Sequence, residues 1–160
     1  MSVCNWKSFA LLLSTVTLFG CGPKINLEPE NPTWDRTVCE RCRMMVTDRQ
    51  YSAQVVNPKN GKHFYFDDFG CAVNWLEEAK PEWAGEAIIY VTSAKDGTWL
   101  DVKKAVIAKP FITPMSYGYG VVAKADQVPE GKTVVTWEAA REDLMRLKLE
   151  KMKNRAHVHH

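Results

Sequence analysis

The chain has 160 residues, of which 25% are charged and 46% are hydrophobic, and its formal net charge is +2. Because these charges nearly cancel and form no dense basic run, the composition argues against a nucleic-acid partner. The length is sufficient for one domain with a substantial core after a short N-terminal segment is removed.

The N-terminal residues are typical of the signal peptide of a bacterial lipoprotein. Lys7 precedes an apolar stretch at residues 9–20, which has the length of a signal-peptide core and is too short to span a bilayer. The stretch ends in Leu-Phe-Gly-Cys, which resembles a lipobox, where cleavage precedes a cysteine that is then acylated. An ordinary signal peptide with a chance cysteine is the alternative. We therefore predict a signal peptide at residues 1–20 and lipidation of Cys21.

The residues around Cys21 indicate where the protein is anchored. Gly22, and not Asp, follows the cysteine, so nothing argues for retention in an inner membrane. We expect an anchor in the outer membrane, facing the periplasm, because several acyl chains hold a protein stably at about 0.8 kcal/mol per buried CH₂. Residues 21–38 carry three prolines and no periodic apolar pattern, which predicts a flexible tether.

Residues 39–95 predict a first ββαβ half. Asn60-Gly61 indicates a tight hairpin turn between two strands. Asp67 or Asp68 is expected to cap a helix that ends near Ala79, because aspartate accepts from the free N–H groups of a first helical turn. The three strands are predicted at residues 51–57, 62–66 and 87–91.

Residues 96–153 predict a second half of the same kind. Thr136 is expected to cap a closing helix that ends near Met152, and residues 154–160 are expected to form a frayed, solvated tail. Strands are predicted at residues 99–100, 105–107 and 121–125, with a loop at residues 111–120. The predicted fold class is therefore α+β, with two related ββαβ-type halves after the signal peptide and the tether.

A cluster of soft donor atoms lies directly before the first predicted strand. Two thiols and two thioethers fall within seven residues, and such ligands select Cu(I) over hard cations. The cluster has the sequence Cys39-Glu40-Arg41-Cys42-Arg43-Met44-Met45.

Other meanings of a Cys-x-x-Cys pair fit this chain less well. Covalent haem attachment needs a histidine directly after the second cysteine, and Arg43 occupies that position. A zinc ribbon needs a second Cys-x-x-Cys pair, and the only other cysteines after the signal peptide are Cys21 and Cys71. A thioredoxin-like pair belongs beside a βαβ pattern, whereas this pair precedes the first strand. A structural disulfide remains an alternative.

The remaining polar residues predict no catalytic site. Cys71 leaves an odd number of thiols after the lipidated cysteine is set aside, and we expect it to be a small buried core residue. Asp67 and Asp68 fit helix capping better than a hard-metal or acid–base pair. No Ser/His/Asp set, phosphate loop or spaced histidine cluster is present in the sequence, so we do not expect an enzyme.

A methionine in the second half completes a family resemblance. Met115 follows a proline in a loop rich in glycine and tyrosine, where it can present a thioether or pack under its own loop. A lipobox, Cys-x-x-Cys-x-Met, a strand ending in Phe-Asp-Asp before a Gly-Cys helix, and this Pro-Met loop occur in that order. Together they resemble NosL, the copper-chaperone lipoprotein family associated with nitrous oxide reductase, over roughly residues 21–137.

The resemblance implies a function and a ligand set. NosL-like proteins have two related ββαβ halves, bind Cu(I) and deliver it for assembly of the reductase's copper centres, beside a membrane transporter complex encoded with the enzyme. Carried over by position, the metal ligands would be Cys42, Met44 and Met115, with Cys39 less firmly assigned. Ser116 stands where a ligating histidine would be expected, so the resemblance leaves a fourth ligand unassigned.

Two other functions remain open from the sequence. The first is a periplasmic thiol–disulfide protein that uses the Cys39/Cys42 pair, and the second is a lipoprotein with a structural disulfide and no metal. A binding and transfer module is favoured over both, because one thiolate with two thioethers holds Cu(I) and disfavours Zn²⁺ and Ca²⁺.

Overall fold

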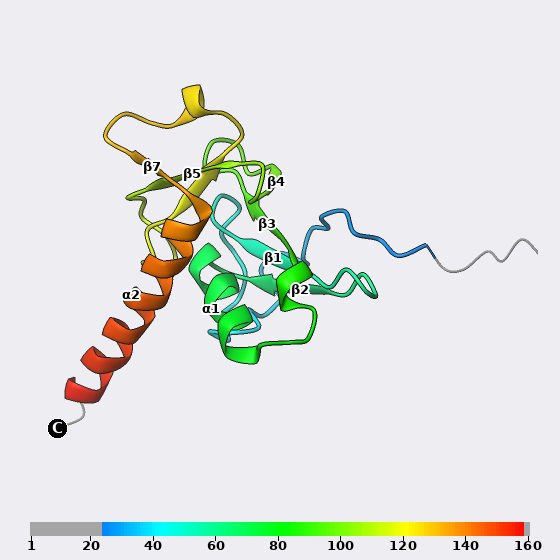
Figure 1. The fold of residues 1–160 in the computed structure, drawn as a ribbon, viewed down its shortest axis with the longest axis horizontal. Coiled ribbons are helices and arrows are strands. Elements are labelled where there is room, and N and C mark those ends of the chain that lie inside the picture. The colour runs from blue at the N-terminus through cyan, green and yellow to red at the C-terminus, as the bar shows by residue number, and fades with distance from the viewer. Residues whose placement is uncertain (1–23, 159–160) are drawn as a thin grey trace, which may run out of the picture.

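A computed structural model describes residues 24–158 of the chain. The predicted signal peptide and Cys21 lie outside these residues. The described chain forms two antiparallel sheets and two helices, so the α+β class predicted from the sequence is confirmed (Figure 1). Among the described residues, no helix is both long enough and apolar enough to cross a membrane.

The first sheet has four strands in the order β2-β1-β3-β4. Its hairpin forms where Asn60-Gly61 predicted it, with Val56 opposite His63 and with Gly61 at a φ of 71°. That positive φ favours glycine because it has no Cβ. The strands are β1 (Ala53–Val56), β2 (His63–Phe66), β3 (Ile88–Thr92) and β4 (Trp99–Asp101).

Helix α1 (Phe69–Ala79) packs against β1 and β2 (Figure 1). The carboxylate of Asp68 accepts a hydrogen bond from the Gly70 N–H at 2.8 Å, which confirms the predicted cap. The helix ends at Lys80, which adopts the left-handed conformation, and Pro81 follows it. A short 3₁₀ segment, η1 (Ala84–Glu86), leads into β3.

The second sheet has three strands in the order β6-β5-β7. It is followed by the long helix α2 (Trp137–Val158), whose first turn is capped by Thr136 through a 3.2 Å hydrogen bond from the Ala139 N–H. The strands are β5 (Val106–Lys109), β6 (Gly120–Val122) and β7 (Thr133–Val135), with the 3₁₀ segment η2 (Ala125–Gln127) between the last two.

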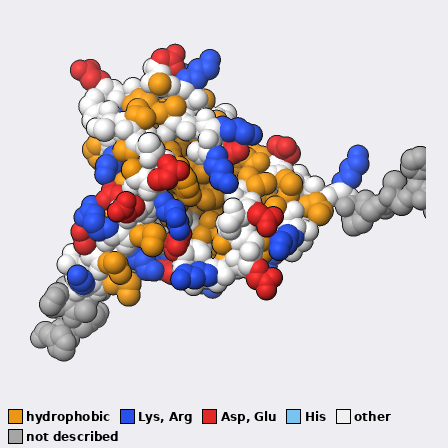
Figure 2. All heavy atoms as spheres, in the orientation of Figure 1, with side chains coloured by type: hydrophobic (Ala, Val, Ile, Leu, Met, Phe, Trp, Pro, Cys, Tyr) orange, Lys and Arg blue, Asp and Glu red, His pale blue; other side chains and the backbone are white. Residues whose placement is uncertain are grey.

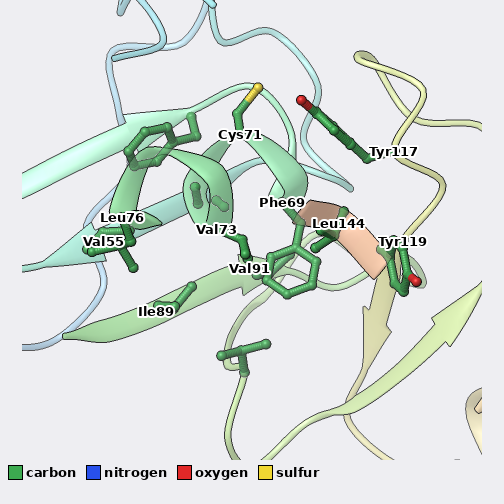
Figure 3. Close-up of a cluster of buried hydrophobic side chains, with 14 of the residues drawn as sticks. Val55, Phe69, Cys71, Val73, Leu76, Ile89, Val91, Tyr117, Tyr119 and Leu144 are labelled. Carbon is green, nitrogen blue, oxygen red and sulfur yellow. The ribbon is translucent and has the colours of Figure 1, made fainter. Parts of the chain in front are cut away.

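The two sheets and both helices share one core (Figure 3). A parallel bridge between Ser93 and Val121 joins the sheets, and α2 packs against α1 through Ala140 and Leu144, which are fully buried. Phe69 at the start of α1 lies between Tyr119 and Trp137, at ring-centroid distances of 6.5 and 6.1 Å. The second half is therefore packed directly onto the helix of the first half.

Three segments differ from what the sequence predicted. Strand β4 pairs with β3 in the first sheet, and β7, which was not predicted, completes the second sheet. Residues 154–158, predicted as part of a tail, belong to α2. The turn before these residues carries a charged pair four residues apart, Arg146 and Glu150, which stabilises the helix that they extend.

The described part of the predicted tether packs on the first sheet. The Glu30 N–H donates to the Gln54 side chain at 3.1 Å, and the Trp99 indole N–H donates to Asn31 at 2.8 Å. Trp34 stacks on Trp99 with ring centroids 6.4 Å apart. The residues that lead to the cysteine pair are thus held against β1 and β4.

Charged side chains of both signs are mixed over the surface in Figure 2, including the turns of α2 at the lower left. Figure 1 shows the C-terminal turns of α2 running beyond the sheets. Among the side chains of this helix that the structure describes, three large apolar ones are exposed by 38% or more: Met145, Leu149 and Met152.

Candidate metal centre

Three thiols meet between the Cys-x-x-Cys loop and the start of α1. The Sγ atoms of Cys39, Cys42 and Cys71 all lie within 4.8 Å of one another, and the three cysteines are free thiols. Cys39 and Cys71 are fully buried, whereas Cys42 is partly exposed. Three cysteine thiols this close together could hold a metal ion.

The backbone of the loop brings the two cysteines of the pair together. Val38 and Met45 form an antiparallel bridge, and the Cys39 N–H donates to the Met44 carbonyl at 2.8 Å. Arg43 has a φ of 65°, and its N–H donates to the Cys39 carbonyl at 3.1 Å, which closes a tight turn. This turn aims the Cys42 N–H at the Cys39 sulfur, 3.5 Å away.

Cys71 reaches the cluster from the first turn of α1. Its sulfur points away from the apolar side chains at the centre of the core, towards the side where the Tyr117 hydroxyl lies (Figure 3). Cys71 was predicted as a buried core residue, and it is buried, but its proximity to the other two thiols was missed.

The three thiols do not ionise alike. A hydrogen bond from Cys71 lowers the pKa of Cys39 from 9.0 to about 5, against the effect of its burial. Burial raises the pKa of Cys42 from 9.0 to about 11. The same hydrogen bond to Cys39, together with burial, raises the pKa of Cys71. Without metal, the cluster therefore carries one negative charge at neutral pH, on Cys39.

A carboxylate also lies close to the cluster. Asp67 is buried, and this burial, with the nearby charge of Cys39, raises its pKa from 3.8 to about 6. Its Oδ1 atom has no hydrogen-bond partner among the described residues. Asp67 does not belong to the group of atoms that could share one ion with the three thiols.

A pocket of about 560 Å³ opens beside the thiol cluster, and Cys42 is the one cysteine of the three that lines it. Thioethers from three parts of the chain line the same pocket: Met44 from the loop, Met115 from the second half and Met152 from α2. Basic side chains also line it, from Arg41, Lys148 and Lys151.

Buried hydrogen bonds hold the Met115 loop against α1. Asp68, which caps the helix with Oδ1, accepts with Oδ2 from the Thr113 hydroxyl at 2.6 Å and from the Met115 N–H at 3.0 Å. On the other side, Lys151 of α2 donates to the Met115 carbonyl. The loop thus connects the first half of the fold to the closing helix.

The structure brings together three of the four ligand positions expected from the resemblance. Cys42, Met44 and Met115 line one pocket, while Cys39 lies behind them in the buried thiol cluster. Met45 is 56% exposed and is not part of the pocket lining. Sequence reasoning missed Cys71 and Met152. The capped helix start at Asp68 does place Cys71 in a first turn, but nothing in the sequence tells where α2 packs.

No protein-family profile matches the chain, and no curated protein matches it.

Proposed function

We propose that this protein is a periplasm-facing lipoprotein that binds Cu(I) and delivers it for assembly of the copper centres of nitrous oxide reductase. The observation that carries the proposal is the convergence of Cys42, Met44 and Met115 on one pocket. Cys42 and Met44 come from the first half of the fold and Met115 comes from the second half, and each supplies a sulfur atom. Cu(I) prefers such ligands, whereas Ca²⁺ and Mg²⁺ need oxygen.

Met152 is the fourth sulfur that the sequence left unassigned. It lines the same pocket and is 58% exposed, so its side chain is not required for core packing. Two contacts hold this part of α2 over the pocket: Lys148 pairs with Glu78 at 2.7 Å, and Lys151 donates to the Met115 carbonyl. Three thioethers and one thiolate give a soft ligand set of low total charge.

The exposure of these donors suits transfer. Met44 is 52% exposed and Met152 is 58% exposed, so a partner's donor atoms can replace them one at a time. Copper then passes between proteins without release as a free ion. This exchange favours a delivery protein over a storage protein or an enzyme.

The order of motifs supports nitrous oxide reductase as the destination. The lipobox, the Cys-x-x-Cys-x-Met element, the Phe-Asp-Asp strand end and the Pro-Met loop follow one another as in NosL-like proteins. The partners are then the reductase and its membrane transporter complex, and the two halves of the fold are related units that each pair short strands with one helix. The lipid on Cys21 holds the protein at the outer membrane.

A competition titration tests copper binding. The purified, reduced full-length chain in detergent is titrated with Cu(I) against a chromophoric chelator, without oxygen. We expect one tightly bound Cu(I), and Cys42→Ser should lose most of this affinity because only a thiolate sulfur binds strongly. Met45→Leu is the matched control, since Met45 is a neighbouring thioether outside the pocket. Unchanged binding in Cys42→Ser would place the site elsewhere.

A thiol–disulfide exchange protein is the second candidate function. It is favoured by the lowered pKa of Cys39, because a thiolate attacks disulfides and a thiol does not. Cys39→Ser should abolish such an activity, since two thiols are needed for its cycle. A copper-delivery protein with Cys39→Ser keeps part of its Cu(I) binding and still loads the reductase. Normal copper binding with complete failure in the cell would favour the exchange function.

A further inference from the structure

We propose that Cys39, Cys42 and Cys71 form a second, inner Cu(I) position, which shares Cys42 with the outer position at Met44 and Met115. This inference rests on the proposed function, because it assumes that the cargo is Cu(I). It assigns a role to Cys71, which no part of the delivery proposal uses. One copper ion occupies the two positions alternately, since both need the same thiolate.

The geometry of the three thiols fits one ion. With a metal–thiolate bond of about 2.3 Å, three sulfurs placed evenly around an ion in one plane lie about 4 Å apart. The Sγ atoms here all lie within 4.8 Å of one another, so small side-chain rotations are enough to reach that arrangement. The Cys42 N–H directed at Cys39 Sγ at 3.5 Å is the kind of contact that stabilises a metal-bound thiolate.

The position of Cys42 connects the inner site to the outside. Cys39 and Cys71 have no exposed surface, and neither lines the described pocket. Cys42 belongs both to the thiol cluster and to the pocket wall. An ion that enters through the pocket therefore meets Met44, Met115 and Cys42 first, and it reaches the two buried sulfurs by remaining bound to Cys42.

The inward step is a ligand exchange without electron transfer. Copper stays Cu(I) and keeps its bond to the Cys42 sulfur. Its bonds to the Met44, Met115 and Met152 thioethers break, and bonds to the Cys39 and Cys71 thiolates form. Any protons still held by these thiols are released to water. Three thiolates bind Cu(I) more strongly than one thiolate with thioethers, so the inner position retains copper and the outer position exchanges it.

The test compares two variants of the full-length chain in detergent. Cys71→Ala removes a ligand of the inner position, and Met115→Leu removes a ligand of the outer position. In Cys71→Ala we expect one Cu(I) still to bind, with an affinity lower by about tenfold or more, which corresponds to about 1.4 kcal/mol. X-ray absorption should show fewer thiolate sulfurs around copper than in the unsubstituted protein. Transfer of copper to a small chelator should become faster, because the retaining position is lost. Met115→Leu should instead slow loading and transfer while keeping the three-thiolate shell.

Val73→Ala is the matched control, because it shows what weaker packing of α1 does without the loss of a metal ligand. Val73 is 2% exposed on the same helix and has no donor atom, so its truncation weakens packing without removing a ligand. It should lower the melting temperature and leave copper affinity unchanged. If Cys71→Ala binds and releases copper as the unsubstituted protein does, with the same sulfur shell, the inner position is wrong and the delivery function stands. If the unsubstituted protein binds no Cu(I), both proposals are wrong.

Discussion

Among the glycines that the structure describes, Gly70 has the least room for a side chain. A Cβ built there would lie 2.2 Å from Cγ of Tyr117. The tyrosine ring is held from two other directions, because its hydroxyl accepts from Arg41 at 2.9 Å and Lys151 lies over its face at 4.5 Å. Glycine therefore lets the Met115 loop approach the start of α1 closely enough for Met115 and Cys42 to line one pocket.

Gly70→Ala should displace Tyr117 and loosen the pocket. We expect the free energy of unfolding to fall by about 1–3 kcal/mol, as for an overpacked core, and copper affinity to fall with it. Urea unfolding and chelator competition measure the two effects. Gly85→Ala is the control, because a Cβ at Gly85 meets nothing within 4 Å. Equal effects of the two substitutions would mean that the contact with Tyr117 is unimportant.

Cys39 gives the metal-free protein a measurable pH dependence. Its pKa is about 5 in the folded chain against an ordinary value of 9.0, chiefly because Cys71 donates a hydrogen bond to the thiolate. A lowered pKa in the folded state adds stability that is complete above pH 9 and is lost as the pH falls towards 5. Thiolate absorbance should accordingly show one ionised cysteine at neutral pH.

Cys71→Ala removes the donor of this hydrogen bond and should raise the pKa of Cys39, whereas Cys39→Ser should abolish the absorbance at neutral pH. A neutral-pH thiolate that survives in Cys39→Ser would belong to a different cysteine.

Helix α2 has two exposed methionines about two turns apart, and only Met152 lines the pocket. Met152 contributes to the wall of the pocket that contains Cys42, while Met145 lies beside Trp137 and Arg141 in a separate hollow. Both side chains are exposed, by 58% and 38%. The two residues therefore form a matched pair that separates donation of sulfur from loss of a surface methionine.

Met152→Leu should slow the loading and transfer of Cu(I), as Met115→Leu does, while Met145→Leu should leave both rates unchanged. Neither substitution should alter the free energy of unfolding by more than about 1.5 kcal/mol, because Leu and Met have similar volumes. The rate of copper transfer to a chelator and urea unfolding provide the measurements. If both variants load and transfer copper like the unsubstituted protein, α2 supplies no ligand.

The sequence predicts best those elements that form through interactions between residues close together in the chain. The hairpin of β1 and β2 and the caps of both helices depend on nearby residues, so Asn60-Gly61, Asp68 and Thr136 were enough to predict them. Strand β7 depends on β5, a partner distant in the chain, which a local pattern does not reveal. Strand β4 pairs with β3 across a short turn, and its pairing was missed although the interaction is local.

The candidate site divides in the same way. The Cys-x-x-Cys-x-Met element could be found because its donors are adjacent in sequence. Cys71 and Met152 join it only when α1 and α2 pack against the loop and pocket. From the sequence, Cys71 was predicted to be an ordinary core residue, because free cysteines are commonly buried in protein interiors.

The attachment of the complete chain to the membrane gives a further prediction. If Cys21 carries the lipid, Cys21→Ser should either release the protein from the membrane or block processing of its precursor. Membrane fractionation and fatty-acid labelling measure this outcome. A Cys21→Ser protein that is cleaved normally, labelled and still membrane-bound would contradict the predicted anchor.

The carboxylate of Asp68 makes the two sheets inseparable. One oxygen caps α1, which carries Cys71. The other oxygen accepts hydrogen bonds from the Thr113 hydroxyl and the Met115 N–H of the second half. A fragment that ended after β4 would expose this buried acceptor, and a fragment that began at β5 would lose the anchor of its methionine loop. The domain is therefore not modular: neither sheet can be exchanged, duplicated or expressed alone with its share of the sulfur donors in place.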